Sequence, residues 1–159
     1  MSTPSDSTAP PLDLDRLPGN AIRRLQQIAV AVFLQETEKH GLTPVQYSAL
    51  QGIENNPGVD QRTLARTIGF DTSTTASVID RLESRGLVLR NASPSDKRVR
   101  LLTLTDEGRT LLAGVIPAML RAQERMLDPL PEADRAEFMR MLRTLVTANN
   151  DLSRAPSEA

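Results

Sequence analysis

The stretch GLVLRNASPSDKRVRLLTLTDEG, residues 86–108, combines two apolar, β-prone runs with a polar segment rich in turn-forming residues. We interpret residues 86–90 as a short strand, residues 91–97 as a polar turn and residues 98–105 as a second strand. The turn is longer than the two-residue connection of a tight hairpin. The sequence therefore predicts a β-hairpin with an extended, exposed tip.

Positive charge is concentrated at the tip of this hairpin. Lys97, Arg98 and Arg100 fall within four consecutive positions, although the whole chain has 19 Lys and Arg against 20 Asp and Glu. Residues 81–100 contain six cations and two carboxylates, which gives this segment a net charge of +4 and leaves −5 for the rest of the chain. Because only the part of a protein that approaches DNA needs to be positive, this asymmetry indicates phosphate contact.

Two short predicted helices precede the hairpin. The first is capped by Asp60 and closed by Gly69, and the second begins near residues 71–73 and ends near Arg85. Two short helices joined by a tight glycine turn suggest a helix-turn-helix, in which the second helix lies in the major groove. A hairpin attached directly to such a pair is a wing, so the sequence predicts a winged helix-turn-helix.

On this interpretation, DNA would meet small hydroxyls at the start of the second helix, arginines further along it and the cations of the wing. The candidate DNA-contacting residues are Thr72, Ser73, Thr74, Ser77, Arg81, Arg85, Lys97, Arg98 and Arg100. A second interpretation remains open, in which the Ser/Thr cluster is merely an over-provided helix N-cap.

Amphipathic patterns on either side of this module predict further helices. Apolar residues recur at three- and four-residue steps over residues 20–40 and 43–55. A long helix is expected to begin after Thr105 and to be kinked by Pro117, and residues 130–132 begin the last helix. The fold class is therefore mainly α, with the small β-hairpin wing as its principal β element.

The first and last helices carry broad apolar stripes that the small winged module cannot cover. We expect them to pack against their counterparts in a second subunit; a monomer whose terminal helices pair with each other is the alternative. A two-fold dimer would place its recognition helices about 34–36 Å apart on a palindromic operator. The expected division is a disordered N-terminal arm (1–17), an N-terminal dimerisation helix (18–42), the winged helix-turn-helix module (43–105), C-terminal dimerisation helices (106–150) and a flexible tail (151–159).

Missing residue types argue against several function classes. With no cysteine there is no disulfide, thiolate metal site or thiol nucleophile, and the single histidine, His40, cannot build a zinc site alone. The apolar helices contain no paired acid and base residues that would indicate an enzyme, and no motif indicates a cofactor. No stretch approaches 18 apolar residues, and the first 15 residues lack the apolar core of a secretory signal. We therefore expect a cytoplasmic protein with neither a membrane nor a metal as a partner.

The quoted stretch resembles the wing signature of the MarR family of bacterial transcriptional regulators: an Asp-x-Arg at the wing tip, then a strand that ends in Leu-Thr-x-x-Gly. The residues in these places are Asp96, Arg98, Leu104, Thr105 and Gly108. The similarity extends over roughly residues 22–146. The resemblance implies a DNA-binding dimer in which Arg98 enters a narrow, A·T-rich minor groove while Asp96 holds the turn and orients the guanidinium.

Members of this family commonly bind small phenolic or aromatic acids between the dimer helices and the winged module. The resemblance therefore implies a repressor that a ligand releases from DNA. By the same resemblance Arg23 or Arg24 would hold a carboxylate, and His40, Gln46 and Tyr47 would contact ring or hydroxyl groups. Purely structural roles also fit His40, at a helix end, and Tyr47, on an apolar helix.

The helical part of the sequence, residues 41–88, is also similar to the branch of the family that controls catabolism of nicotinate and related aromatic acids. That similarity implies a small aromatic carboxylate as effector, with a hydroxypyridine carboxylate of the 6-hydroxynicotinate kind as one form. The residues themselves do not distinguish this ligand from a benzoate, nor a repressor from an activator. The alternative function is a winged-helix protein-interaction module that does not bind DNA.

Overall fold

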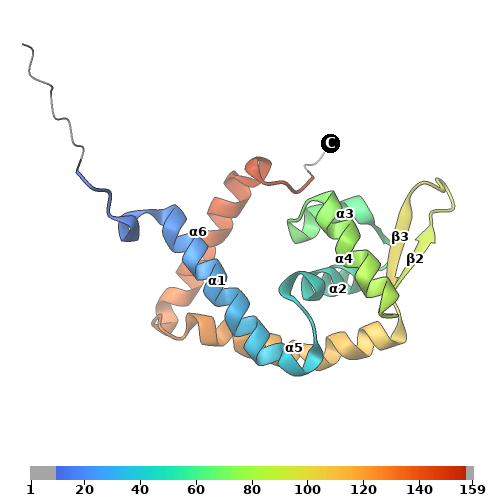
Figure 1. Cartoon of the computed structure of the whole chain (residues 1–159), viewed down its shortest axis with the longest axis horizontal. Coiled ribbons are helices and arrows are strands. Elements are labelled where there is room, and N and C mark those ends of the chain that lie inside the picture. The colour runs from blue at the N-terminus through green and yellow to red at the C-terminus, as the bar shows by residue number, and fades with distance from the viewer. Residues whose placement is uncertain (1–9, 157–159) are drawn as a thin grey trace, which may run out of the picture.

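The computed structural model describes residues 10–156, so the first nine residues of the expected arm and the last three of the expected tail lie outside the described part. Within it, helices dominate and a small antiparallel sheet carries the wing (Figure 1). The elements in chain order are η1 Leu14–Arg16, α1 Pro18–Thr37, η2 Glu38–His40, α2 Pro44–Asn55, β1 Val59–Asp60, α3 Gln61–Ile68, α4 Thr72–Ser84, β2 Val88–Ala92, β3 Arg100–Leu104, α5 Asp106–Leu127, α6 Glu132–Ala148 and η3 Asn150–Leu152. The expected mainly helical winged fold is confirmed.

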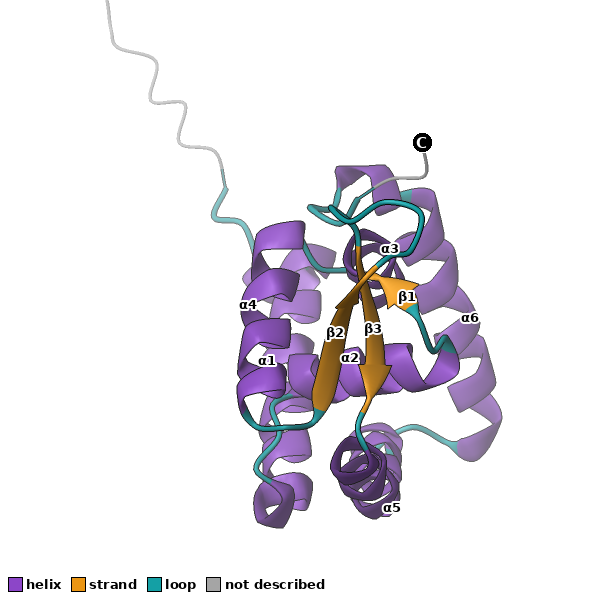
Figure 2. Cartoon of the chain, turned by 90° about the vertical axis from the view of Figure 1, so that its right-hand side faces the viewer, coloured by secondary structure: helices purple, strands orange, loops and turns teal. Residues whose placement is uncertain are grey.

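The sheet has three strands in the order β1-β3-β2, with β3 in the middle (Figure 2). Val59 of β1 lies opposite Leu102, and Val88 of β2 lies opposite Leu104. The two-residue strand β1 was not expected from the sequence, because two residues are too few to show the alternation that marks a strand. Its second residue, Asp60, is also the N-cap of α3, as the sequence predicted.

In the wing, residues 88–104, the turn spans residues 93–99 and so lies two residues further along the chain than the predicted turn at 91–97. The second strand was expected to begin at Arg98 but begins at Arg100. The backbone N–H of Arg98 donates to Asp96 Oδ1 at 3.0 Å, and that of Val99 donates to the carbonyl of Asp96 at 2.9 Å. These two amides therefore close the turn and are not available to a strand.

The hydrophobic core fills the space between α2, α3, α4, the sheet and the first half of α5. Its largest fully buried side chains are aliphatic: Leu50, Ile53, Leu64, Ile79, Leu82, Val88, Leu102 and Val115. Burying such side chains is the main stabilising term in a domain of this size. This core holds α4 and the wing as one unit.

The junction between the wing and α5 is unusually close. The Thr105 hydroxyl accepts a hydrogen bond from the Gly108 N–H at 3.0 Å and donates one to the Gly86 carbonyl at 2.6 Å. A Cβ on Gly108 would lie 2.1 Å from the carbonyl oxygen of Leu87. The Thr-x-x-Gly sequence is therefore needed here, because the threonine caps α5 and the glycine lets a backbone carbonyl approach the helix.

Helix α1 packs against α5, which runs below the winged module in Figure 1. Glu36 of α1 accepts from Arg121 at 3.4 Å and from Arg125 at 3.2 Å, so two ion pairs link the helices at this level. Pro117 lies inside α5, which continues through it to Leu127. No residue of α6 is buried in the described chain.

Both ends of the described chain carry short turns inside segments that the sequence assigned to a disordered arm and a flexible tail. Asp13 caps η1 by accepting from the Asp15 N–H at 3.1 Å, and the Asn20 side chain donates to the Leu14 carbonyl at 3.1 Å. At the other end η3 continues two residues beyond position 150. The sequence did not predict these short turns, because local hydrogen bonds leave no signal in the hydrophobic pattern.

Candidate nucleic-acid interface

The start of α4 is organised by Asp71. Its carboxylate accepts from the Thr74 N–H and from the Thr74 hydroxyl, each at 2.7 Å, and these hydrogen bonds hold the pKa of Asp71 below its usual value. The Thr75 hydroxyl is buried and donates to the Asp71 carbonyl at 2.9 Å. The N-cap interpretation of the Ser/Thr cluster therefore applies to Thr74 and Thr75, whose hydroxyls are engaged within the helix.

The outward face of α4 carries the other candidates. Ser73, Ser77 and Arg81 are spaced by four residues, so they lie in a row along one side of the helix. All three are exposed, and within residues 10–156 none of their side chains makes a hydrogen bond or ion pair. Thr72, the first residue of the helix, is exposed beside them. This row of short hydroxyls and one arginine is a surface that a DNA groove can reach.

Arg85 stands apart from that row. It is the C-cap of α4, and its guanidinium Nη1 donates to the carbonyl of Gly41 at 3.0 Å. Gly41 has a φ of 61°, in the left-handed region, and turns the chain between α1 and α2. The structure thus gives Arg85 an anchoring contact between α4 and the α1–α2 turn, and its contact with DNA stays a prediction.

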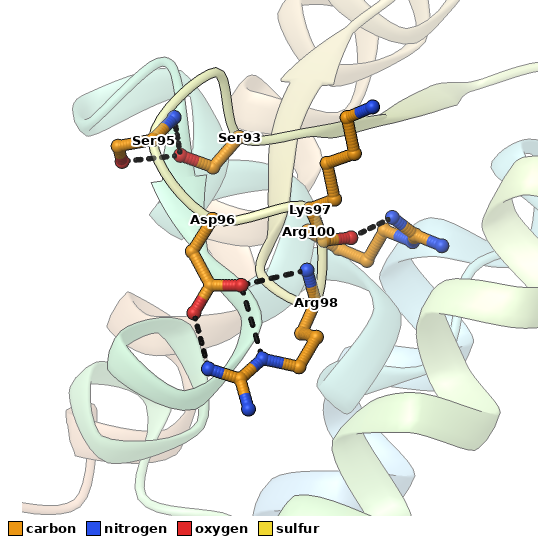
Figure 3. A network of polar contacts seen from close by, with 6 residues as sticks. All are labelled: Ser93, Ser95, Asp96, Lys97, Arg98 and Arg100. Carbon is orange, nitrogen blue, oxygen red and sulfur yellow. Dashed lines mark hydrogen bonds and ion pairs between the residues drawn. The ribbon is translucent and has the colours of Figure 1, made fainter.

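The wing tip holds a bidentate ion pair between Asp96 and Arg98 (Figure 3). Arg98 Nε lies 3.1 Å from Oδ1 of the carboxylate, and Nη2 lies 3.2 Å from Oδ2. The hydrogen bonds from the Arg98 side chain, and then from its backbone, hold the pKa of Asp96 below its usual value. Because the Arg98 side chain is 91% exposed, the pair contributes little to stability and acts mainly to orient the guanidinium.

The other wing cations extend away from this pair, as Figure 3 shows. Lys97 is exposed, and Arg100 Nη1 donates to the Lys97 carbonyl at 2.8 Å. The Ser93 and Ser95 hydroxyls meet at 3.0 Å on the other side of the turn. The wing therefore presents three cations in different directions from one short, internally bonded turn.

Arg90 of β2 was not among the candidate residues. Its guanidinium forms ion pairs with Asp80 and with Glu83 of α4, the latter at 3.5 Å, and its side chain is only 19% exposed. Arg90 thus ties the wing to α4 through two carboxylates of the helix and offsets one of their two negative charges. In the sequence its positive charge was the only signal, since the partners lie on another element across the Gly86 turn.

The ligand candidates on α2 have neighbours within the chain. Tyr47 donates to Gln51 Oε1 at 3.2 Å, and burial raises the pKa of its hydroxyl. The rings of Tyr47 and Phe33 are 5.9 Å apart. Gln46 Oε1 accepts from the Thr43 N–H at 3.1 Å and completes the capping box of α2. Tyr47 lies beside an open cavity of about 380 Å³ lined by Phe33, Pro44, Tyr47, Ser48, Met119 and Gln123.

The remaining ligand candidates lie away from that cavity. Arg23 donates to Asn20 at 2.9 Å and Arg24 to Asp15 at 3.1 Å, on the exposed first turns of α1. Ten residues of helix, or about 15 Å, separate Arg23 from the level of Phe33. His40 lies beside α5, and its Nδ1 is buried with no hydrogen-bond partner in the described chain. Within one chain the five candidates are therefore not brought together.

No helix among residues 10–156 has the length and apolar character that a membrane span requires. Over the same residues, no group of three or more His, Cys, Asp or Glu side chains has the proximity to hold a metal ion.

Comparison with known proteins places this surface in context. Residues 42–99 match the sequence model of the MarR family. The chain is 34% identical to the transcriptional regulator HosA of Escherichia coli O111:H-, over 83% of this chain and 98% of that protein. It is similar to the transcriptional repressor CouR bound to a 23-mer DNA duplex, with a TM-score of 0.79 and 35% identity over 86% of this chain and 99% of that one.

A second solved structure is of BpsR from Bordetella bronchiseptica, whose DNA binding is regulated by 6-hydroxynicotinic acid. The TM-score is 0.81 and the identity 27%, over 85% of this chain and 96% of that one.

Proposed function

The chain belongs to the MarR family of transcriptional regulators, and from this premise we propose that it is a cytoplasmic homodimeric repressor, released from a palindromic operator by a small aromatic carboxylate. Its role as a DNA-binding transcription regulator, not an enzyme, follows from the family. The observation that carries the proposal is the pairing of an exposed Ser73–Ser77–Arg81 row with an Arg98 that Asp96 holds out from the wing.

The two parts of this surface suit two grooves. A helix fits the major groove, where serine hydroxyls reach base edges and an arginine reaches guanine. A guanidinium on an extended wing suits the minor groove, whose negative potential is greatest where it is narrow. Arg90 supports this division because its ion pairs with Asp80 and Glu83 hold the wing in one position relative to α4.

Ser73→Ala is expected to change the ranking of operator variants several-fold at the base pairs next to α4 while altering affinity for unrelated DNA less than about twofold. The reason is that the Ser73 hydroxyl is exposed and makes no hydrogen bond within residues 10–156, so it is available to a base edge. Competition binding against a set of single-base operator variants measures this. Ser84→Ala is the control, because that hydroxyl donates to the Asp80 carbonyl at the far end of α4. A uniform loss over all sequences would make Ser73 a phosphate contact.

Dimerisation is supported by apolar surface that the described chain leaves uncovered. Met141, Leu145 and Val146 of α6 are about half exposed or more, and so are Ile22 and Ile28 of α1. The monomer alternative would require α1 and α6 to cover each other, and in the described chain they do not. A second copy that covers both helices would remove these side chains from water.

A chain that ends after Asp128 is expected to be a folded monomer with weak operator affinity. Helix α6 buries none of its residues against the rest of the described chain, so its loss leaves the core intact but removes the apolar face of a dimer. Analytical ultracentrifugation and circular dichroism measure the two effects separately. A chain that ends after Ser153 serves as control and should remain dimeric. A stable dimer without α6 would contradict this assignment of the dimer face.

The effector proposal is supported by the cavity beside Tyr47. Its aromatic and thioether lining suits a flat ring, while Ser48 and Gln123 offer hydrogen bonds. No cation lines this cavity within one chain, so a cation that holds a carboxylate there would come from a second copy, for which Arg23 and Arg24 are the candidates. The regulation of BpsR by 6-hydroxynicotinic acid supports a hydroxypyridine carboxylate as the first compound to test.

The test is release of the protein from its own upstream intergenic DNA by a panel of aromatic and pyridine carboxylates at fixed salt. We expect one compound class to relieve binding, because a ligand that prefers the non-binding geometry shifts the equilibrium away from DNA. Met119→Trp, which fills the cavity, should abolish the response while DNA binding persists. Binding that no compound relieves would contradict the effector proposal, and no specific binding would favour the protein-interaction alternative.

A further inference from the structure

Arg85, at the end of α4, makes a long-range contact that the proposed DNA surface does not use. Its guanidinium Nη1 donates to the carbonyl of Gly41 at 3.0 Å, and its backbone N–H donates to the Arg81 carbonyl at 3.1 Å as the C-cap of the helix. Among residues 10–156 this side chain makes no other hydrogen bond and no ion pair. The described contacts of the Arg85 side chain therefore join α4 to a turn 44 residues away.

The turn that receives this contact lies where α1 joins the winged module (Figure 1). Gly41 ends η2 with a φ of 61°, Leu42 is buried in the core and Thr43 caps α2. His40 of η2 lies beside Gly114 of α5. The α1–α2 turn, and the Gly41 carbonyl with it, is therefore held by α1, α2 and α5 together.

The space around Gly41 is otherwise open. If a Cβ is built on Gly41, Arg85 Nη2 at 3.9 Å is the only atom of the described chain within 4 Å of it, apart from the chain neighbours of Gly41. A cavity of about 510 Å³ also borders the turn, lined by Gly41, Leu42, Thr43 and the end of α1. Because no other side chain closes around Gly41, the guanidinium is the group that ties α4 to the turn at this point.

The position of this contact along α4 gives it leverage over the DNA-facing end. The inward face of α4 packs into the core through Val78, Ile79 and Leu82. Such apolar contacts are non-directional, whereas a hydrogen bond prefers one line of approach. Twelve residues of helix, or about 18 Å, separate Arg85 from Ser73. A helix that pivots on its buried middle moves its two ends in opposite directions, so a restraint at Arg85 also restrains Ser73.

We propose that Arg85 is a positioning residue that sets the half-site spacing accepted by the dimer, because it holds α4 at one angle to α1. The proposal rests on the proposed function, since it requires a homodimer on a palindromic operator. Helix α1 carries part of the proposed dimer face, including Ile22 and Ile28. The angle between α4 and α1 therefore decides how far apart the two copies of Ser73 lie. A dimer without the Arg85 contact holds its recognition helices less rigidly and accepts more spacings.

The first arm of the test measures affinity for the operator in the upstream intergenic DNA and for versions with one base pair inserted or removed between the half-sites. Each change moves the half-sites by about 3.4 Å and rotates them by about a tenth of a turn. The wild-type chain should prefer the natural spacing about tenfold or more, and Arg85→Ala should reduce this preference to about threefold or less. Arg85→Lys keeps a charged donor and should retain part of the preference. Arg154→Ala, in the tail beyond α6, is the control and should retain all of it.

A salt titration on the natural operator separates positioning from direct contact with DNA. If Arg85 held a phosphate, Arg85→Ala would lower the slope of log affinity against log salt by about 0.9 for each lost contact, or about 1.8 for the dimer. A positioning residue should instead lower the affinity for the natural operator and leave this slope unchanged. Thermal unfolding checks that the variants fold, and Arg85→Gln takes the place of Arg85→Ala if the alanine variant is unfolded.

Two results would overturn the proposal: an unchanged spacing preference in Arg85→Ala, or a wild-type chain that accepts all three spacings equally. A loss of slope with the preference intact would make Arg85 a phosphate contact. Absence of operator binding by the wild-type chain would instead contradict the proposed function, and amide hydrogen exchange without DNA would then test the anchor by itself. Arg85→Ala should speed exchange in the α1–α2 turn and at the end of α4, and unchanged exchange would rule the anchor out.

Discussion

Arg98→Ala is expected to weaken operator binding about tenfold or more while leaving the protein folded. Arg98 is the most exposed member of the ion pairs in the wing, and its only side-chain contact in the described chain is the carboxylate of Asp96. An exposed pair of this kind contributes little to folding. On DNA the same guanidinium would enter the minor groove of each half-site, where removing it costs both charge and hydrogen bonds.

Two further variants separate these contributions. Arg98→Lys keeps the charge but loses the planar fork, so its affinity should lie between those of the wild type and of Arg98→Ala. Asp96→Asn can still accept from the Arg98 backbone N–H but loses the ion pair, so it should weaken binding less than Arg98→Ala. Fluorescence anisotropy gives the affinities, and thermal unfolding checks the fold. Wild-type affinity in Arg98→Ala would remove the wing from the DNA interface.

Gly108→Ala is expected to lower the free energy of unfolding by about 2–3 kcal/mol, and the melting temperature by about 5–10 °C. The added Cβ would lie 2.1 Å from the Leu87 carbonyl oxygen and 3.1 Å from its carbon, so strand and helix must separate. That carbonyl also accepts from the Thr105 N–H at 3.1 Å. The substitution therefore strains the hydrogen bonds that join the wing to α5.

Gly114→Ala is the matched control, because it lies in the same helix with open space around it. The nearest atom to its added Cβ is His40 Nε2 at 3.9 Å, an ordinary contact. This substitution should stabilise the protein by about 0.5–1 kcal/mol through helix propensity. Urea unfolding should therefore show a lower free energy of unfolding for Gly108→Ala and a higher one for Gly114→Ala. Equal effects would mean that the close approach at Gly108 is not needed.

Local capping chemistry was the part of the fold most readily predicted from the sequence. Asp60, Asp71 and Thr105 precede helices at the expected positions, and each side chain accepts from a backbone N–H of the first turn. Such caps depend on residues only three positions apart, so their signal lies within a short stretch of sequence. The wing signature could be recognised for the same reason.

Contacts between elements could not be predicted in this way. Arg90 pairs with two carboxylates of α4, and Arg85 binds a carbonyl 44 residues away. The same limit applies to Arg62 of α3 and Arg100 of β3, which line one open cavity of about 610 Å³ only because the fold brings their elements together. A sequence pattern records that these arginines are present and gives no information on which charges are already balanced.

The sequence predicted the exposure of some candidate site residues but not the hydrogen bonds that engage others. Ser73 and Arg81 are both exposed on α4, because side chains spaced by multiples of four residues lie on the same face of a helix. Thr74 and Gln46 were also candidates, but each side chain is engaged as a helix cap. A polar residue near a helix start serves equally well as a cap or as a contact, so only the structure distinguishes the two.

The measurement that tests the central claim most directly is fluorescence anisotropy of the wild-type chain on its upstream intergenic DNA, titrated with salt, against a scrambled duplex of equal length. The account predicts tight binding to the upstream DNA, a steep loss of affinity with salt and far weaker binding to the scrambled duplex. Equal, weak affinity for both duplexes would contradict the claim that α4 and the wing form a sequence-reading surface.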